Sequence, residues 1–281
     1  MELGVHGVNI SVAATGADTA RLARRAEQLG YGSWWTGDHV VMPASAPQDG
    51  PNGPADPIVD SLVHLSYVAA VTERLRLGTG ILILPQRNPL VLAKQAASLD
   101  ALSGGRLLLG VGPGWQAAEM RAVGVDPTQR GARTDEYLDA MTSLWTDEAP
   151  EFHGRYVDFA DVIAAPRPVT PGGPPIIIGG QSPAALRRAV GRGHGWFFAG
   201  TVDGLVEGLR GLEKAAGEVD RPARLGRLEI TFMNANPADI SADTARQVAD
   251  LGVDRFLVFA TPSRTADAAE RFLERHADLP R

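Results

Sequence analysis

Cysteine is absent from this chain of 281 residues, which excludes disulfides, thiolate metal ligands and cysteine nucleophiles. Lysine is nearly absent, occurring only as Lys94 and Lys214. No apolar run approaches the roughly 20 residues that a membrane-spanning helix needs. The N-terminus "MELGVHGVNIS" also lacks the basic and apolar regions of a signal peptide. We therefore expect a cytoplasmic protein with no membrane partner.

The chain also has no excess of positive charge. The formal net charge is -6 and the pI is near 5.5, with no basic patch in the sequence, so a nucleic-acid partner is not expected. No His, Asp and Glu spacing resembles a metal site. The expected partner is a small-molecule substrate, and no metal ligands are predicted.

The chain does contain a repeated alternation of two patterns. Short runs rich in β-branched residues and leucine, without polar alternation, are typical of strands buried on both faces of a parallel sheet. Longer stretches with helical spacing of apolar residues follow them. The expected strands are 3–11, 33–40, 75–84, 106–112, 174–180, 195–199, 227–233 and 254–260. The expected helices are 19–30, 58–72, 89–103, 134–145, 183–192, 203–216, 242–250 and 265–276.

Eight strand–helix units in a chain of 281 residues predict an α/β fold, a (β/α)8 TIM barrel forming one domain over residues 1–281. A doubly wound sheet would more often have fewer units or a second domain. A Pro- and Gly-rich loop near 40–57 and an excursion near 113–168, with a hairpin at 152–162, interrupt the repeat. In such a barrel the ligand-binding groups lie at the carboxyl ends of the strands.

The stretch "LLLGVGPGWQAAE" (107–119) resembles a dinucleotide loop at first sight. The third glycine of that motif is missing, and Pro113 has no N–H for a phosphate. Two interpretations remain: a tight turn, or a wall on which Gly112 and Gly114 let a flat ring lie against the backbone beside Trp115.

A better anion site lies at "IIIGGQSP" (176–183). A buried strand runs into Gly179 and Gly180, and Ser182 then precedes proline as a candidate helix N-cap. Backbone N–H groups at the positive end of a helix dipole bind anions. The alternative is an ordinary capped helix.

His39 is the leading proton-transfer residue, because it alone among the histidines clearly ends a predicted strand. A purely structural role is the alternative. Asp38 points to the opposite side of an extended strand, so the two need not pair. His6 is placed in mid-strand and is a weaker candidate. Gly80, inside the third strand, indicates either a bulge or simple tolerance of small residues.

Taken together, "AEQLGYGSWWTGDHV" (26–40), the stretch 74–115 and the stretch 174–196 resemble the luciferase-like flavin/deazaflavin oxidoreductase family, most of all its branch that uses coenzyme F420. The resemblance implies a cofactor ring at the carboxyl mouth of the barrel, held by a third-strand bulge. It further implies that His39 assists proton transfer with Asp38 beside the ring. The bulge would comprise Thr79, Gly80 and Ile81, with a non-prolyl cis peptide between the last two.

The resemblance assigns the cofactor phosphate to the backbone amides of Gln181 and Ser182. It also reveals a departure: a sugar-phosphate dehydrogenase of this family has a glutamate where this chain has Trp115. A sugar-phosphate substrate is therefore doubtful. Glu119, one helical turn later, is either a substitute in the substrate pocket or a surface residue, and the sequence slightly favours the surface.

The expected function is F420-dependent oxidoreduction, with hydride transfer between the deazaflavin C5 and a small organic substrate. The loop 40–57 and the insertion 150–168 would shape or cover the substrate pocket. Two alternatives stay open: an FMN-dependent monooxygenase, and a flavin- or F420-binding protein with little turnover. A homodimer is expected by family resemblance.

Overall fold

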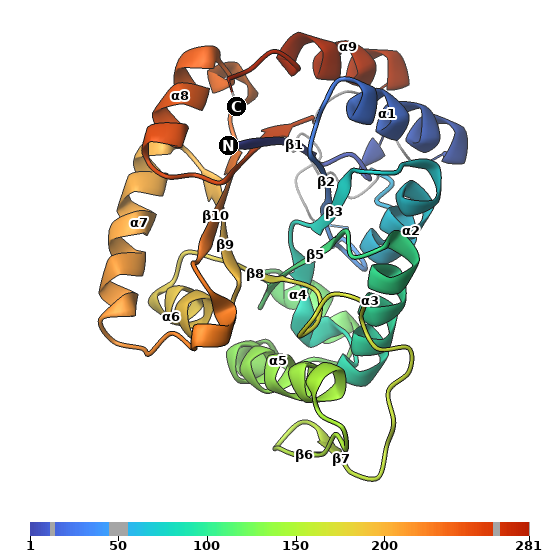
Figure 1. Ribbon diagram of the computed structural model, residues 1–281, viewed down its shortest axis with the longest axis vertical. Coiled ribbons are helices and arrows are strands. Elements are labelled where there is room, and N and C mark those ends of the chain that lie inside the picture. The colour runs from blue at the N-terminus through green and yellow to red at the C-terminus, as the bar shows by residue number, and fades with distance from the viewer. Residues whose placement is uncertain (12–14, 45–55, 261–264, 281) are drawn as a thin grey trace.

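The computed structural model describes residues 1–11, 15–44, 56–260 and 265–280. Eight parallel strands close into a barrel surrounded by helices, which confirms the predicted TIM barrel (Figure 1). The third barrel strand consists of two pieces, β3 and β4. The barrel strands are β1 (Glu2–His6), β2 (Ser33–Thr36), β3 (Arg76–Thr79), β4 (Leu82–Ile83), β5 (Leu107–Gly112), β8 (Ile176–Gly179), β9 (Gly195–Gly200), β10 (Glu229–Asn234) and β11 (Arg255–Phe259).

The helices follow the strands, as a βα repeat requires. They are α1 (Gly16–Gln28), α2 (Ser61–Val71), α3 (Pro89–Ser103), α4 (Ala117–Ala122), α5 (Arg130–Thr146), α6 (Pro183–Arg192), α7 (Val202–Ala216), α8 (Ala242–Asp250) and α9 (Ala266–His276). Short 3-10 helices are Leu84–Gln86, Pro127–Gln129, Ala223–Leu225 and Pro237–Asp239. Side-chain caps begin many of the helices; Asn88, for example, accepts from the N–H groups of Leu90 and Val91, with Pro89 at the first position of α3.

The barrel closes through two pairings. β1 lies between β2 and β11, where His6 pairs with Trp35 on one side and Phe259 on the other. On the other side of β2, β3 pairs directly with β5, with Gly78 opposite Leu108. The carboxyl ends of β1, β2 and β11 therefore meet at one mouth, which positions the site.

The apolar core has two layers. A small cluster fills the barrel interior: Trp35, Leu108, Ile177, Phe197 and Leu257. A larger layer lies between the strands and the helices, and there the Nε1 atom of Trp34 donates to Nε2 of His64 at 3.0 Å. Burial lowers the pKa of His64 to about 4, so its imidazole is neutral and free to accept this bond.

Three differences from the predicted strands lie beside the cavity. β1 ends at His6 because Gly7 turns the chain with a φ of 80°, and β2 ends at Thr36. The predicted third strand breaks at Gly80–Ile81, where the peptide bond is cis. The predicted bulge with its non-prolyl cis peptide is thereby confirmed.

The excursion after β5 contains more helix than the sequence predicted. The sequence indicates α4 only as a helical turn before Glu119, without bounds, and α5 begins at Arg130, four residues earlier than predicted. The predicted hairpin is present as β6 (Phe152–His153) and β7 (Asp158–Phe159), and it projects beyond α5 (Figure 1). Glu136 of α5 holds it by accepting from three consecutive backbone N–H groups, those of residues 155–157.

Most of the predicted loop 40–57 lies outside the described residues, which omit 45–55. Among the helices that the structure describes, none is both long and apolar enough to cross a membrane.

Candidate active site

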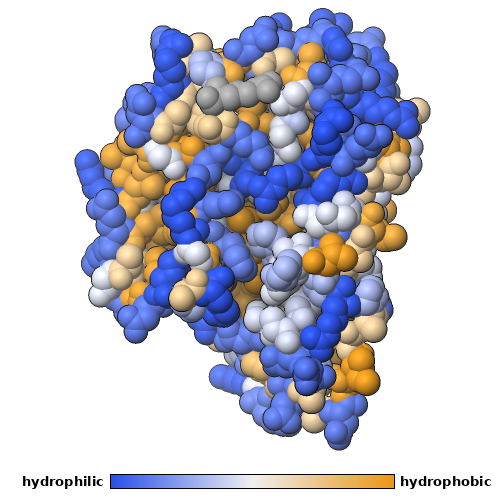
Figure 2. Space-filling view, viewed as in Figure 1, coloured by the Kyte–Doolittle hydropathy of each residue, from blue (hydrophilic) through white to orange (hydrophobic). Residues whose placement is uncertain are grey.

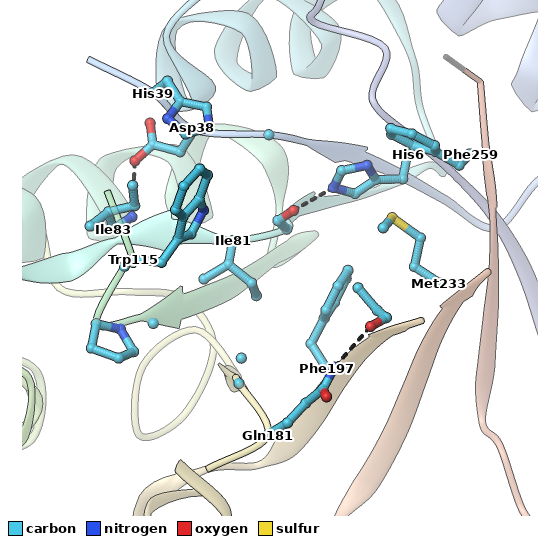
Figure 3. A pocket seen from close by; sticks show the side chains of 18 of the residues that line it. His6, Asp38, His39, Ile81, Ile83, Trp115, Gln181, Phe197, Met233 and Phe259 are labelled. Atoms are coloured by element: carbon cyan, nitrogen blue, oxygen red, sulfur yellow. Dashed lines mark hydrogen bonds between the residues drawn. The ribbon is translucent and has the colours of Figure 1, made fainter. Parts of the chain in front are cut away.

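A cavity of about 430 Å³ opens at the carboxyl ends of the barrel strands (Figure 3). One side carries His39 and Trp115, the opposite side carries His6, Phe259 and Met233, and Ile81 lies between them. The lining is His6, Ile10, Gly37, Asp38, His39, Gly80, Ile81, Ile83, Gly112, Pro113, Gly114, Trp115, Gly179, Gly180, Gln181, Phe197, Ala199, Met233 and Phe259. This is the size range of small-molecule and cofactor pockets.

Glycine backbone makes up part of the cavity wall. A Cβ on Gly112 would lie 3.1 Å from Cγ2 of Ile81, and one on Gly179 would lie 2.6 Å from its Cγ1. A side chain at Gly179 would therefore collide with Ile81, which follows the cis peptide, and one at Gly112 would be in tight contact with it. The resulting wall is narrow, apolar and formed by main chain, which suits a flat ring.

His39 is held by a carboxylate. Its Nδ1 lies 3.1 Å from Oε2 of Glu119, and Oε1 of Glu119 accepts from the backbone N–H of Val40 at 2.6 Å. Glu119 is completely buried. The ring of His39 also meets Trp115 edge-on, with centroids 6.4 Å apart. The imidazole is thus fixed from two sides at the cavity wall.

Asp38, the neighbour of His39, has a different set of contacts. Its Oδ2 accepts from the N–H of Ile83 at 2.9 Å, and its Oδ1 pairs with Nη2 of Arg87 at 2.6 Å. Burial raises the pKa of Asp38, and the Arg87 guanidinium opposes that shift. The same guanidinium nitrogen binds Asp60 at 3.0 Å. Asp38 lines the cavity, but its carboxylate ties β2 to β4 and to the start of α2.

His6 lies across the cavity at the end of β1. Its Nε2 donates to the carbonyl of Gly80, and burial lowers its pKa to about 4, an effect that this bond only partly opposes. The ring is therefore neutral with its lone pair on Nδ1. That atom is buried and has no hydrogen-bond partner in the part of the chain that the structure describes.

The predicted anion site at the start of α6 has the expected local structure. Ser182 is the N-cap, its side chain accepts from the N–H of Ala185, and Pro183 is the first helical residue. Gly180 has a φ of 117°, a conformation that favours glycine. The side chain of Gln181 donates to the carbonyl of Ala199 (Figure 3), and its backbone N–H has no acceptor among the described residues.

The cavity brings together most of the residues predicted from sequence. The predicted residues that line it are Asp38, His39, Gly80, Ile81, Gly112, Pro113, Gly114, Trp115, Gly179, Gly180 and Gln181. Three others are not part of the lining: Thr79, Ser182 and Glu119. Thr79 is buried, and its hydroxyl donates to the carbonyl of Gly110 at 2.6 Å.

The preference for a surface position of Glu119 is wrong. The helix α4 carries this side chain back beneath His39, and a buried carboxylate that accepts several N–H donors is stable there. The placement of His6 in mid-strand is also wrong, because the strand ends at this residue.

Sequence reasoning also missed Arg87 as the partner of Asp38. One available signal was the isolated arginine in "PQRNP" directly after the broken third strand. A charged side chain so close to a barrel mouth needs a counter-charge when it is buried.

The comparisons with known sequences place the chain in a family. The model of the luciferase-like monooxygenase family matches residues 3–280. An uncharacterized protein of Mycobacterium tuberculosis is 32% identical over 284 residues, covering 97% of each chain.

Two relatives of named activity use different cofactors. An F420-dependent glucose-6-phosphate dehydrogenase of Kineococcus radiotolerans is 32% identical, covering 72% of this chain and 61% of its own length. An FMNH2-dependent dimethylsulfone monooxygenase of Pseudomonas putida is 34% identical, covering 56% of this chain and 43% of its own.

A solved structure confirms the fold. An F420-dependent secondary alcohol dehydrogenase in complex with an F420–acetone adduct superposes with a TM-score of 0.78 at 16% identity, covering 97% of both chains. The barrel, its carboxyl-end cavity and the match over residues 3–280 agree. The chain belongs to the luciferase-like monooxygenase family of oxidoreductases.

Proposed function

We propose that this protein is an F420-dependent oxidoreductase acting on a small organic substrate. The observation that carries the proposal is His39, an imidazole held at the wall of the cavity by a buried carboxylate. Transfer of a hydride to or from the carbon of an alcohol or carbonyl requires a proton acceptor or donor at the adjacent oxygen. A positioned imidazole is the side chain best suited to that purpose near neutral pH.

The cavity fits a flat deazaflavin or flavin ring. Gly112 and Gly179 present backbone on either side of Ile81, so the ring can lie against main chain. His6 offers a buried acceptor nitrogen that has no partner among the described residues. Among the described residues the backbone N–H groups of Gln181 and Ser182, just before α6, have no acceptor and could bind a phosphate. When bound, the deazaflavin supplies or accepts the hydride at C5.

The protein's share of the chemistry is positioning and proton transfer. The apolar side chains of Ile81, Phe197 and Met233 line the cavity and would limit the access of water to a bound ring. His39 takes the hydroxyl proton when an alcohol is oxidised and returns it when a carbonyl is reduced. Trp115, 74% exposed at the rim, packs against the His39 ring and bounds the substrate side.

The cofactor assignment is tested by titrating the purified protein with F420 and, separately, with FMN, following the absorbance and fluorescence of each. We expect saturable micromolar binding of F420 and much weaker binding of FMN. Tight binding of FMN without binding of F420 would favour the alternative, an FMNH2-dependent monooxygenase. Binding of F420 with no turnover of any alcohol or carbonyl tested would favour the low-turnover binding protein.

A matched pair of variants locates the binding site in the same titration. Gly112→Val places a side chain in the glycine wall and is expected to weaken F420 binding at least tenfold. Gly131→Ala adds a methyl group where no neighbouring atom lies within 4 Å and is expected to leave binding unchanged. If the two variants bound F420 with equal affinity, the cofactor would have to bind outside the part of the cavity lined by Gly112.

We also propose that the protein is a homodimer that buries the outer face of α2 and α3. α2 has no charged side chain, and both charged residues of α3 have intramolecular partners: Lys94 donates to the Ala165 carbonyl, and Asp100 accepts from Thr170. Exposed apolar side chains on this face and beside it are Val63, Tyr67, Val91, Leu102, Ile163 and Val169. Hydrophobic groups reach the surface at the right-hand edge of Figure 2, where Figure 1 places these helices. A group of exposed apolar side chains of this kind commonly marks a protein–protein contact.

The oligomer prediction is checked by light scattering coupled to size-exclusion chromatography. We expect the protein to elute as a dimer and the Leu102→Glu variant, whose leucine is 83% exposed, to elute as a folded monomer. The control is Arg210→Glu on α7, a charge reversal on a different face, which should remain dimeric. A monomeric wild-type protein would refute the dimer.

A further inference from the structure

We propose that Glu119 is a positioning residue that fixes the tautomer of His39, so that the lone pair of Nε2 is the acid–base nitrogen facing the substrate. This inference rests on the proposed function for its chemistry, but its structural part stands on the contacts of two side chains. They come from distant parts of the chain, the segment that follows β2 and the helix α4.

The first observation is that the Glu119 carboxylate acts only as a hydrogen-bond acceptor. Its Oε2 lies 3.1 Å from Nδ1 of His39, and its Oε1 lies 2.6 Å from the backbone N of Val40 and 3.4 Å from that of Val41. Burial alone would raise the pKa of Glu119. The hydrogen bond and charge attraction from the His39 ring and the hydrogen bond from the Val40 N–H outweigh that effect and hold the pKa of Glu119 below its usual value. The carboxylate is therefore ionised near neutral pH and has no proton to donate.

The tautomer follows from this donor and acceptor inventory. A neutral imidazole carries one N–H, and an ionised carboxylate can only accept. The proton of neutral His39 must therefore lie on Nδ1, in the bond to Glu119, which leaves a lone pair on Nε2. Among the described residues, Nε2 of His39 has no hydrogen-bond partner, and His39 lines the cavity.

The ring is also held against rotation. A flip about the Cβ–Cγ bond would break the Glu119 bond and leave a completely buried carboxylate without this donor. The edge-on contact with Trp115, at an interplanar angle of 87°, confines the ring from the rim side. Burying a carboxylate is costly, and an acidic residue of α4 could have stayed in solvent. Its placement under the imidazole is what a positioning role requires.

The proton balance is simple. In the oxidation direction the O–H bond of the substrate alcohol breaks and its proton goes to Nε2 of His39. The C–H bond of the carbon that bears this hydroxyl breaks as well, and its hydride goes to the cofactor. His39 becomes an imidazolium, which the Glu119 carboxylate stabilises. In the reduction direction Nε2–H returns the proton to the carbonyl oxygen as the hydride arrives.

The test is Glu119→Gln, which keeps the shape of the side chain. The N–H of Val40 still needs an acceptor, so the amide oxygen takes the Oε1 position and the NH2 group faces Nδ1 of His39. The amide then donates to Nδ1, and the imidazole proton moves to Nε2. With F420 as cofactor we expect kcat for alcohol oxidation to fall about 100- to 10,000-fold, while the dissociation constant of F420 changes less than about threefold.

A second readout does not depend on turnover. Nitrogen-15 spectra of the free protein at about pH 8.5, above the ordinary histidine range, report which imidazole nitrogen carries the proton. The His39→Ala variant assigns the signals. We expect Nδ1–H for His39 in the wild-type protein and Nε2–H in Glu119→Gln. Glu119→Asp, which keeps the charge, should keep Nδ1–H and recover part of the lost rate.

A matched control pair exists on the surface. His153 and Asp158 form the same kind of contact at 2.8 Å but are 64% and 76% exposed, on the hairpin. Contrary to the expectation from sequence, no residue of the insertion 150–168, all of which the structure describes, lines the cavity. Asp158→Asn is therefore expected to leave kcat unchanged. An unchanged kcat in Glu119→Gln, or an Nε2–H signal for His39 in the wild-type protein, would overturn the inference. If F420 fails to bind while the tautomer changes as predicted, the cofactor assignment fails and the positioning role stands.

Discussion

Replacing Gly110 with alanine is expected to destabilise the barrel strongly. A Cβ at Gly110 would lie 1.8 Å from the carbonyl oxygen of Thr79 and 3.0 Å from its carbonyl carbon. Both atoms are main chain on β3, so no side-chain rotation can relieve the contact. The hydroxyl of Thr79 also donates to the carbonyl of Gly110 at 2.6 Å, which holds the two strands together at this point.

The loss of stability depends on whether the added methyl group meets a movable side chain or the backbone. Overpacking against movable side chains costs about 1–3 kcal/mol. A collision with backbone should exceed that range, and we expect a loss of more than about 4 kcal/mol. In a chain of this length the loss corresponds to a fall of roughly 10 °C in Tm. Thermal unfolding followed by circular dichroism, together with the yield of soluble protein, measures it.

Gly131→Ala is the matched control for that measurement. This glycine is the second residue of α5, and no neighbouring atom lies within 4 Å of the position that the added methyl group would take. Alanine is favoured over glycine in a helix by about 0.5–1 kcal/mol, so the variant should melt at the same temperature or slightly above. If Gly110→Ala melted at nearly the same temperature as this control, β3 and β5 would be able to separate at little cost.

The Arg87→Leu variant is expected to lose about 3–5 kcal/mol of stability, because it leaves a buried carboxylate without its counter-charge. Nη2 of Arg87 bridges Oδ1 of Asp38 at 2.6 Å and Oδ2 of Asp60 at 3.0 Å. Only 2% of the Asp38 side chain is exposed. Urea unfolding at fixed pH measures the loss.

The loss of stability in Arg87→Leu should grow as the pH rises. Burial raises the pKa of Asp38 in the folded protein, and removing the opposing guanidinium raises it further. A carboxyl whose folded-state pKa exceeds its unfolded value stabilises the protein below the unfolded pKa. That stability is lost as pH rises through the folded pKa. The Arg87 guanidinium also helps to lower the pKa of Asp60, so its removal acts in the same direction there.

Urea midpoints between about pH 4 and pH 8 check the sign, since the ordinary aspartate pKa lies at the lower end of that range. The difference between wild type and Arg87→Leu should widen toward the alkaline end. Adding Asp38→Asn to Arg87→Leu removes the buried charge and should flatten the profile. A difference that is constant over the range would mean that solvent reaches Asp38 when the arginine is absent.

Local signals in the sequence predicted much of the fold and part of the site. The eight strand–helix units, the break at Gly80 and the cap at Ser182 each depend on a few consecutive residues, and the structure contains all three. His39 was found because the end of a barrel strand is a place where ligand groups gather.

Contacts between distant segments were not predictable in the same way. Glu119 meets His39 across 80 positions of sequence, and Asp38 meets Arg87 across 49. Which way a helix such as α4 turns after its strand depends on packing that no short window contains. The pocket role of His6 depended on where β1 ends, and strand boundaries are set by pairing with neighbours.

Because Trp115 is exposed, its fluorescence can be told apart from that of the buried tryptophans and reports on the mouth of the cavity. The other four tryptophans, Trp34, Trp35, Trp145 and Trp196, are at most 5% exposed, whereas Trp115 is 74% exposed. A collisional quencher such as iodide should therefore extinguish the emission of this one indole first. The quenchable fraction of the intrinsic fluorescence is a label-free gauge of how far a ligand, or the chain itself, covers the entrance.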